Sequence, residues 1–350
     1  MTTLTEQAAA ELIATRAVTP GMPGFVGIAV DLMLDPASAP TGRRALRHGF
    51  LDARSPRVMV VSGPPSPGLD VALRRMSDDL AASHRLVEQH RLTVLDQATD
   101  TVHPDGPEHA LGTATAGVRV GLEAGIDGGG PLGAERRWAL AHTVTPVLAA
   151  AFANAPLRHG RPTGWRSVRQ ALRRDRPVGP PAGSPRDGWS AYVMDARTAA
   201  GRTLREAIRA GARVTENDLQ RHLAALRPPV AARGHLELDV ADRQPEHGWR
   251  VPATVATVLL DDPRAAEEAW QATAHLTAEA GLWERVARDA LTDPVLAAAA
   301  RDCFVAAYGA LARRGASREL RDEVAEFTER YVHRGRCPAD DVLDQVTARP

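Results

Sequence analysis

The sequence predicts an α+β fold in which helices cover an antiparallel sheet, and three observations support that class. Four segments alternate apolar and polar residues as half-buried strands do, namely 25–34, 57–61, 112–122 and 234–241. Two long segments between them, 69–87 and 138–152, carry apolar residues at helical spacing. From residue 262 onward the pattern is entirely helical. Clean alternation indicates that one sheet face packs against helices while the other faces a cavity.

Several helix boundaries have their own signals. The opening segment mixes polar and apolar residues as a short helix does, and it lacks the basic start and apolar core of a signal peptide. Thr215 and Asp218 form a capping-box pattern for a helix that a pair of prolines ends. Thr292 or Asp293 is expected to cap the helix that begins at Pro294.

The whole chain, residues 1–350, is expected to form one domain, because its length is sufficient to bury a sizeable core. The sheet-containing core is predicted to span about residues 20–260, and the helical C-terminal part about 261–335. One Pro/Gly-rich stretch, 176–188, is predicted to be a linker or long loop. No internal repeat is present.

The composition excludes several classes of protein. Acidic and basic residues balance at 43 each, so no overall charge attracts nucleic acid or anionic lipid. The sequence contains no lysine, which excludes a Walker-type phosphate lysine, a Schiff base and pyridoxal phosphate chemistry. No apolar run approaches the roughly 18 residues of a membrane-spanning helix. We therefore expect a cytoplasmic protein with neither a nucleic-acid nor a membrane partner.

The segment 233–242 carries the strongest chemical signal. Its alternation puts His235, Glu237 and Asp239 on one face of a strand and aliphatic residues on the other. Three ionisable groups are costly to bury unless a cation, a ligand or an opposite charge meets them. The functional interpretation is a divalent metal or phosphate site, because carboxylates at a spacing of two converge on one cation. A solvated outer face is the alternative.

Other polar positions give weaker signals. Arg119 and Glu123 lie among small residues of the strand at 112–122, which suits a cavity floor or an exposed edge strand. Asp31 is a single carboxylate among small neighbours. The glycine-rich segment 127–130 lacks the strand-turn-helix spacing of a nucleotide motif, so a plain loop is favoured. The arginines within 161–169 suit clamping of phosphate or carboxylate groups, or a solvated helix end.

Taken in order, several segments resemble the glutamate-cysteine ligases of the actinobacterial ergothioneine pathway, in the carboxylate-amine ligase superfamily. The resemblance covers the chain from about residue 110 to the end and includes GTATAGVRVGLEAG, GRPTGWRSVRQAL, GHLELDVADRQP and GWRVPATVATVLLDDPRAA. It implies a curved antiparallel sheet related to that of glutamine synthetase. It also implies an enzyme that uses magnesium and ATP to phosphorylate the γ-carboxylate of glutamate, after which the amine of cysteine displaces phosphate.

The resemblance also implies roles for particular residues. Glu237 matches the family's strand glutamate that holds metal, and Asp31 and Glu123 are further candidate metal ligands. Arg161, Trp165, Arg166 and Arg169 belong to a stretch of the type G-R-x-T-G-W-x-S-x-R. The resemblance connects this stretch to substrate or nucleotide contacts.

The chain departs from the family at several ligand positions. The family motif G-x-E-x-E is matched by residues 27–31, where Ala29 replaces one glutamate and Asp31 the other. No E-P-G-G-Q-x-E-x-S segment precedes the Gly-Pro-Pro turn, so a strand of ligands is expected to be missing. Where the family has Q-V-N-L-D, this chain begins with Arg119, and the arginine of L-E-x-R becomes Asp239.

These exchanges remove carboxylates and add a guanidinium that stays charged and repels a nearby cation. We therefore expect Arg119 to pair with Glu237, Asp239 or Asp31 and to take the electrostatic place of the metal, with Arg119 and Asp239 at the catalytic position. Three functions are open: an ATP-dependent ligase, a catalytically silent relative that binds or regulates a protein partner, and a ligase remodelled for another acid and amine.

Overall fold

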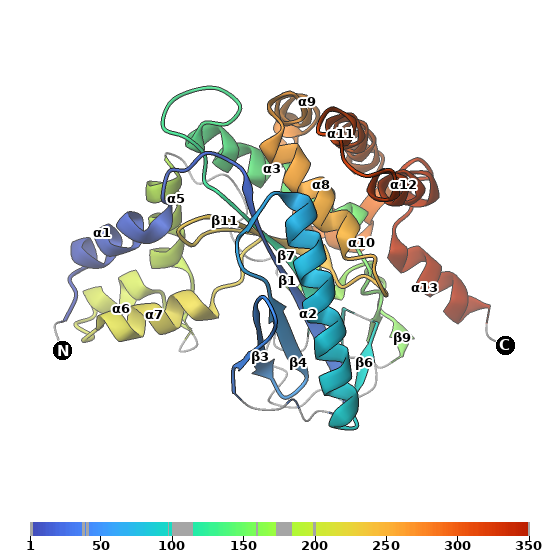
Figure 1. The fold of residues 1–350 in the computed structure, drawn as a ribbon. Helices are drawn as coiled ribbons and strands as arrows, with labels where there is room; N and C mark the ends of the chain where they lie inside the picture. Colours follow the sequence, from blue (N-terminus) through green and yellow to red (C-terminus); the bar gives the residue numbers. More distant parts are fainter. Residues whose placement is uncertain are drawn as a thin grey trace.

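A nine-stranded antiparallel sheet organises the computed structural model (Figure 1), which describes residues 3–36, 39, 42–96, 98–99, 115–158, 160–172, 184–198 and 201–348. Its central strand is β1 (Phe25–Asp35). The strand order is β10 (Val230–Ala232), β11 (Leu236–Asp242), β7 (Gly117–Leu122), β1, β4 (Val58–Ser62), β3 (Phe50–Ser55) and β2 (Arg44–Ala45). Two short strands, β5 (Ser66–Pro67) and β6 (Thr93–Leu95), also pair with β1. The predicted α+β class is confirmed.

The four predicted strands correspond to β1, β4, β7 and β11. The described part of β7 begins at Gly117, and residues 112–114 of the prediction lie outside the described residues. Within this sheet, the prediction missed β2, β3, β5, β6 and β10. Four of these five have only two or three residues, which is too short for an alternating pattern to be visible.

One face of the sheet is apolar, because alternate residues of neighbouring strands come into register. Ile28 pairs with Val120 and Val30 with Val118, so their side chains share a face. The helix α2 (Leu69–Gln89) packs on β1 and β4, α8 (Arg250–Asp261) packs on β7, and α3 (Ala134–Ala151) packs on β11. This face contributes to the main core through the buried residues Val26, Ile28, Val30, Leu32, Leu34, Val118, Val120, Leu122, Leu236 and Leu238.

A β-bulge changes the alternation of β11. The pairing register with β7 shifts between Leu238 and Ala241, so β11 holds one more residue than β7 across this interval. As a result Ala241 joins the apolar face, and Asp242 opposite Gly117 joins the polar face. Strict alternation would have placed Asp242 on the apolar face with Leu238, and the sequence pattern gave no sign of this reversal.

The C-terminal part is helical, as predicted. It contains α9 (Pro263–Thr273), α10 (Leu282–Arg288), α11 (Pro294–Arg313), α12 (Arg318–Phe327) and α13 (Pro338–Thr347). Asp293 is the N-cap of α11 and accepts hydrogen bonds from the N–H groups of Val295 and Leu296, as capping predicts. By length and hydropathy α11 alone among the described helices passes the test for a membrane span, but 56% of it is buried inside the molecule, as in a core helix.

The remaining helices lie beside the sheet. Figure 1 shows α1 (Glu6–Ala17), α5 (Pro185–Asp195), α6 (Leu204–Arg209) and α7 (Glu216–Ala225) on the side of the molecule opposite the C-terminal helices. The predicted capping box of Thr215 and Asp218 begins α7. The predicted linker 176–188 is partly wrong, because its last four residues form the first turn of α5, where Ser184 caps the helix and Pro185 fits its first position. Residues 176–183 of that prediction lie outside the described residues.

Candidate functional site on the polar face of the sheet

The polar face of the sheet centres on Asp31 of β1, whose side chain is fully buried. Nη2 of Arg119 on β7 lies 3.2 Å from Oδ1 of Asp31, and Nη1 of Arg54 on β3 donates to Oδ2 at 2.9 Å. The backbone N–H of Gly117 also donates to Oδ2, at 3.2 Å. One carboxylate therefore holds two guanidinium groups. The predicted pairing of Arg119 with one of the three named carboxylates is confirmed, and the partner is Asp31.

Arg54 is a residue of this face that the sequence analysis missed. The family segment E-P-G-G-Q-x-E-x-S, counted back from Ser62, places its two glutamates at Arg54 and Val60. The hairpin of β3 and β4 occupies this segment, so a strand is present, but the glutamate ligands that were expected to be missing are absent from it. The two glutamate positions carry a cation and an aliphatic side chain. Counting back from the Gly-Pro-Pro turn was the signal that would have found Arg54.

The carboxylates of β11 are paired in a second cluster. Arg169 of the short helix α4 (Val168–Ala171) forms a short ion pair with Asp239, and its Nη1 lies 3.5 Å from Oδ1 of Asp242. All three side chains are almost completely buried. Gly117 makes room for this guanidinium, because a Cβ at that position would lie 2.5 Å from Nη2 of Arg169. The arginine thus lies directly over the sheet.

Glu237 is paired near the outer end of β11. Nε of Arg233 donates to Oε1 of Glu237 at 2.9 Å, and both side chains keep about a fifth of their surface exposed, 23% and 21%. The ring of neighbouring His235 covers Gly121, where a Cβ would lie 3.0 Å from the ring. Burial lowers the pKa of His235, so the imidazole is neutral near pH 7. Each carboxylate on β11 is therefore close to an arginine of opposite charge.

The electrostatics of Arg119 reflect its acidic surroundings. Burial by itself would lower the pKa of the guanidinium, but Asp31, Asp239 and Glu237 together raise it above its ordinary value. Arg119 therefore stays charged at every physiological pH. The opposite shift occurs at Arg227, in the loop before β10, whose pKa is lowered by burial and then by the charge of Arg119. Further guanidinium charge thus lies close to Arg119.

The three candidate metal ligands do not converge. Glu123 lies past the end of β7, where its Oε2 accepts the backbone N–H of Phe25 at 3.0 Å. Asp31 lies six residues further along β1 from Phe25, a distance of about 20 Å at strand rise. Across residues 3–348, wherever the structure describes them, no three His, Cys, Asp or Glu side chains are grouped so as to hold a metal. Oxygen ligands of magnesium must be free and adjacent, so the described residues do not fit magnesium.

The residues predicted to contact substrate or nucleotide lie apart from one another. Arg161 is exposed on the hairpin of β8 (Leu157–Arg158) and β9 (Arg161–Pro162). Nε of Arg166 lies 3.0 Å from Oδ1 of Asp340 on α13, and Trp165 is partly buried beside it in sequence. Arg169 alone of the four reaches the polar face in the described structure. Nucleotide contact by Arg161, Trp165 and Arg166 stays a prediction.

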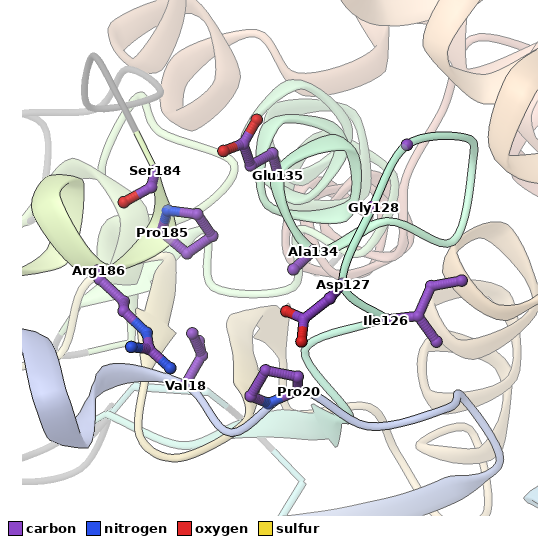
Figure 2. Close-up of a pocket in the computed structure, with 11 residues that line it drawn as sticks. Val18, Pro20, Ile126, Asp127, Gly128, Ala134, Glu135, Ser184, Pro185 and Arg186 are labelled. Carbon is purple, nitrogen blue, oxygen red and sulfur yellow. The ribbon is translucent and has the colours of Figure 1, made fainter.

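A separate cavity of about 560 Å³ lies near the start of β1 (Figure 2). The glycine-rich loop after β7 and the first turns of α3 and α5 line it. Figure 2 shows Arg186 and Asp127 extending toward its middle, and Glu135 also lines it. Gly128 has a φ of 111°, which favours glycine, and the segment forms a turn, as the plain-loop interpretation predicts. Two carboxylates against one guanidinium do not favour binding of phosphate.

Solved structures define the class of this fold. A bifunctional glutathione synthetase from Pasteurella multocida superposes with a TM-score of 0.56 at 12% identity, over 98% of this chain and 51% of that chain. This chain thus spans about half the length of that protein. A glutamate-cysteine ligase from Francisella tularensis in complex with AMP gives a TM-score of 0.52 at 12% identity, over 95% and 86% of the two chains. At such identities the similarity concerns the fold alone, which this chain shares with both proteins.

The family follows from the sequence comparisons. Residues 68–349 match the model of glutamate-cysteine ligase family 2. The chain is 33% identical over 338 residues to the glutamate-cysteine ligase EgtA of Mycolicibacterium smegmatis, covering 83% of this chain and 76% of that protein. EgtA of Mycobacterium tuberculosis is 31% identical over 342 residues, covering 82% and 75%. The chain therefore belongs to glutamate-cysteine ligase family 2 and is a glutamate-cysteine ligase-like protein, which confirms the resemblance.

Proposed function

We propose that this protein is a ligase-like relative that binds small-molecule substrates of the family's type but does not carry out magnesium-dependent formation of an acyl phosphate. One observation carries the proposal: Arg119 and Arg54 both hold the carboxylate of Asp31, with separations of 3.2 Å and 2.9 Å. Each oxygen of this carboxylate thus faces a guanidinium nitrogen, so a metal ion would have to displace one of the two cations. The silent relative among the three open functions is therefore the one that the geometry favours.

The physical reason lies in the charge of the two side chains. A divalent ion needs several oxygen ligands, and a guanidinium within a few ångströms repels it at any pH. To admit magnesium, Asp31 would have to release Arg119 or Arg54, and the released guanidinium would lose its carboxylate partner. Breaking a buried pair in this way costs roughly 3 to 5 kcal/mol. Without magnesium the acyl phosphate would not form, because anionic phosphates need metal ions to offset their charge.

The second candidate function is an ATP-dependent ligase that joins glutamate to cysteine through a γ-glutamyl phosphate, in ergothioneine biosynthesis. The identity of 33% with EgtA of Mycolicibacterium smegmatis favours it. In that case ATP and magnesium are the cofactors, and Glu237, Asp31 and Glu123 would have to leave their partners to hold the metal. A ligase remodelled for another acid and amine would face the same requirement.

The test is turnover with the whole chain. The protein is incubated with magnesium, ATP, glutamate and cysteine, and release of ADP is measured against an active ligase of the family. We expect no release above the rate without protein. Release of ADP that the substitution Glu237→Ala abolishes would overturn the proposal and establish the ligase. Release that survives this substitution would indicate a contaminating ATPase.

A silent relative would act through what it binds, so a protein partner such as an active ligase is part of the proposal. Co-purification of the whole chain with a ligase of the family tests it. The cytoplasmic location stays a prediction.

A further inference from the structure

The polar face holds guanidinium N–H groups that are buried and have no acceptor. In the described part of the chain, Nη1 of Arg119, Nε of Arg54 and Nε of Arg169 have no hydrogen-bond partner. The Arg119 residue is 9% exposed, so water does not reach this group freely. A buried N–H without an acceptor costs roughly 1 to 3 kcal/mol. Such a donor is explained most simply by an oxygen atom that the protein binds.

The charges around Arg119 also leave room for an anion. Arg119 and Arg54 share the single carboxylate of Asp31, so this group of three has a formal charge of +1, whereas the group of Arg169, Asp239 and Asp242 has a formal charge of −1. Asp239 and Glu237 lie near Arg119, but each forms its own ion pair, with Arg169 and Arg233. The positive end of the polar face is therefore at Arg119 and Arg54, and an anion is attracted to that end.

Four small residues lie beside Arg119 on the polar face, and we call this group of small residues the floor of the site. Ala29 pairs with Arg119 and with Ser62, and Gly27 pairs with Gly121. These four small residues are partly exposed, although the sheet around them is buried. A Cβ added at Gly27 would meet only backbone atoms of Gly121, at 3.8 Å or more. Among the described residues, no side chain lies within 4 Å of a Cβ at Gly27, whereas the His235 ring covers Gly121 and Arg169 covers Gly117.

The geometry points to a metal-free binding site for a small oxyanion, in which Nη1 of Arg119 donates to a carboxylate or phosphate oxygen lying over Gly27 and Ala29. The inference rests on the proposed function, because it assigns to the same face a ligand that needs no magnesium. A guanidinium supplies both the charge and the donor that an oxyanion requires. The ligand is a small acid, and its source is either an amino acid or a phosphate compound.

The test measures binding to the whole chain in EDTA. L-glutamate and inorganic phosphate are titrated separately by calorimetry, with chloride at equal ionic strength as the reference. We expect saturable binding of one of the two, which identifies the source, and no change on adding magnesium. Arg119→Gln should weaken binding at least tenfold, whereas Arg301→Gln, at an exposed site on α11, should leave it unchanged. The inference is overturned if neither anion binds more than chloride, or if Arg119→Gln binds as tightly as the natural chain.

A second variant covers the case in which Arg119→Gln does not fold. Ala29→Leu leaves every charge in place and fills the floor beside Arg119, so it should abolish binding. Unchanged binding by Ala29→Leu would also refute the site. This result is independent of the turnover assay: release of ADP refutes the proposed function, and absence of metal-free binding refutes the oxyanion site.

Discussion

The two faces of the central sheet are made by the same strands but are stabilised in different ways. On the apolar face, side chains such as Val30, Leu32 and Val118 are buried under α2, α3 and α8, and they need no particular partner. On the polar face, Asp31 depends on two named guanidinium groups, and Asp239 depends on a third. Apolar burial is non-directional, whereas a buried charge is stable only with its own partner.

This difference has a consequence for how the faces tolerate change. An aliphatic residue can be exchanged for another of similar volume at small cost. A single exchange on the polar face leaves an uncompensated charge, so its residues change together or not at all. Arg54 at a glutamate position of the family motif, Arg119 at its glutamine position and Asp31 in place of a glutamate are a set of exchanges of this kind.

The largest effect is expected at the buried carboxylate. Asp31→Asn keeps the shape of the side chain but leaves Arg54 and Arg119 without a counter-charge, which should lower the free energy of unfolding by roughly 3 to 5 kcal/mol. Urea denaturation measures this. Replacing all three residues by Leu and Met should restore most of the lost stability, because the unpaired charges are then gone. A loss below 1 kcal/mol in the single variant would show that Asp31 is not the centre of the polar face.

The apolar face should respond to loss of volume instead. Leu32→Ala removes a fully buried side chain from the middle of β1 and should cost roughly 2 to 5 kcal/mol, with a centre near 3 kcal/mol. Binding of glutamate or phosphate by the folded fraction should not change. If Leu32→Ala weakened anion binding as much as Arg119→Gln does, the two faces would not be independent, and the comparison would fail.

The helix layer over the apolar face should make stability depend on pH. Burial lowers the pKa of His142 on α3 to about 3, from an ordinary value of 6.5. As the pH falls below 6.5, His142 is protonated in the unfolded chain but stays neutral in the folded chain. The contribution of His142 to the free energy of unfolding is therefore fully present above pH 6.5 and declines toward pH 3. At pH 5 the loss from this group is about 2 kcal/mol.

His142→Phe tests this dependence, since Phe can keep the edge-to-face contact with Trp138, whose ring centroid lies 4.5 Å from that of His142. The difference in unfolding free energy between pH 7 and pH 5 should shrink by about 2 kcal/mol in the variant. An unchanged difference would mean that His142 is not held neutral.

The smallest effect is expected at Glu237. Its pair with Arg233 is partly exposed, so Glu237→Gln should change the free energy of unfolding by less than about 1 kcal/mol. This variant makes the same chemical change as Asp31→Asn and is its matched control. Equal losses in the two variants would indicate that burial does not distinguish the carboxylates of the polar face.

Much of the fold was predictable because it follows from local patterns. The alternation in residues 25–34 and 57–61 predicted β1 and β4, and capping residues predicted where α7 and α11 begin. The short strands were not predictable, since two or three residues carry no period. Among the site residues, Arg119 and Asp31 were expected to interact and do so, whereas Arg54 was overlooked because its strand was taken to be absent.

The sequence by itself determined the family, the alternation that makes a two-faced sheet, and the arginine-only set of cations. The tertiary structure decided which cation meets which carboxylate, because Asp31 pairs with residues 23 and 88 positions away and Asp239 with one 70 positions away. It also placed Asp242 on the polar face through the bulge in β11. Alternation is a property of neighbouring residues in one strand, whereas an ion pair depends on where distant segments come together.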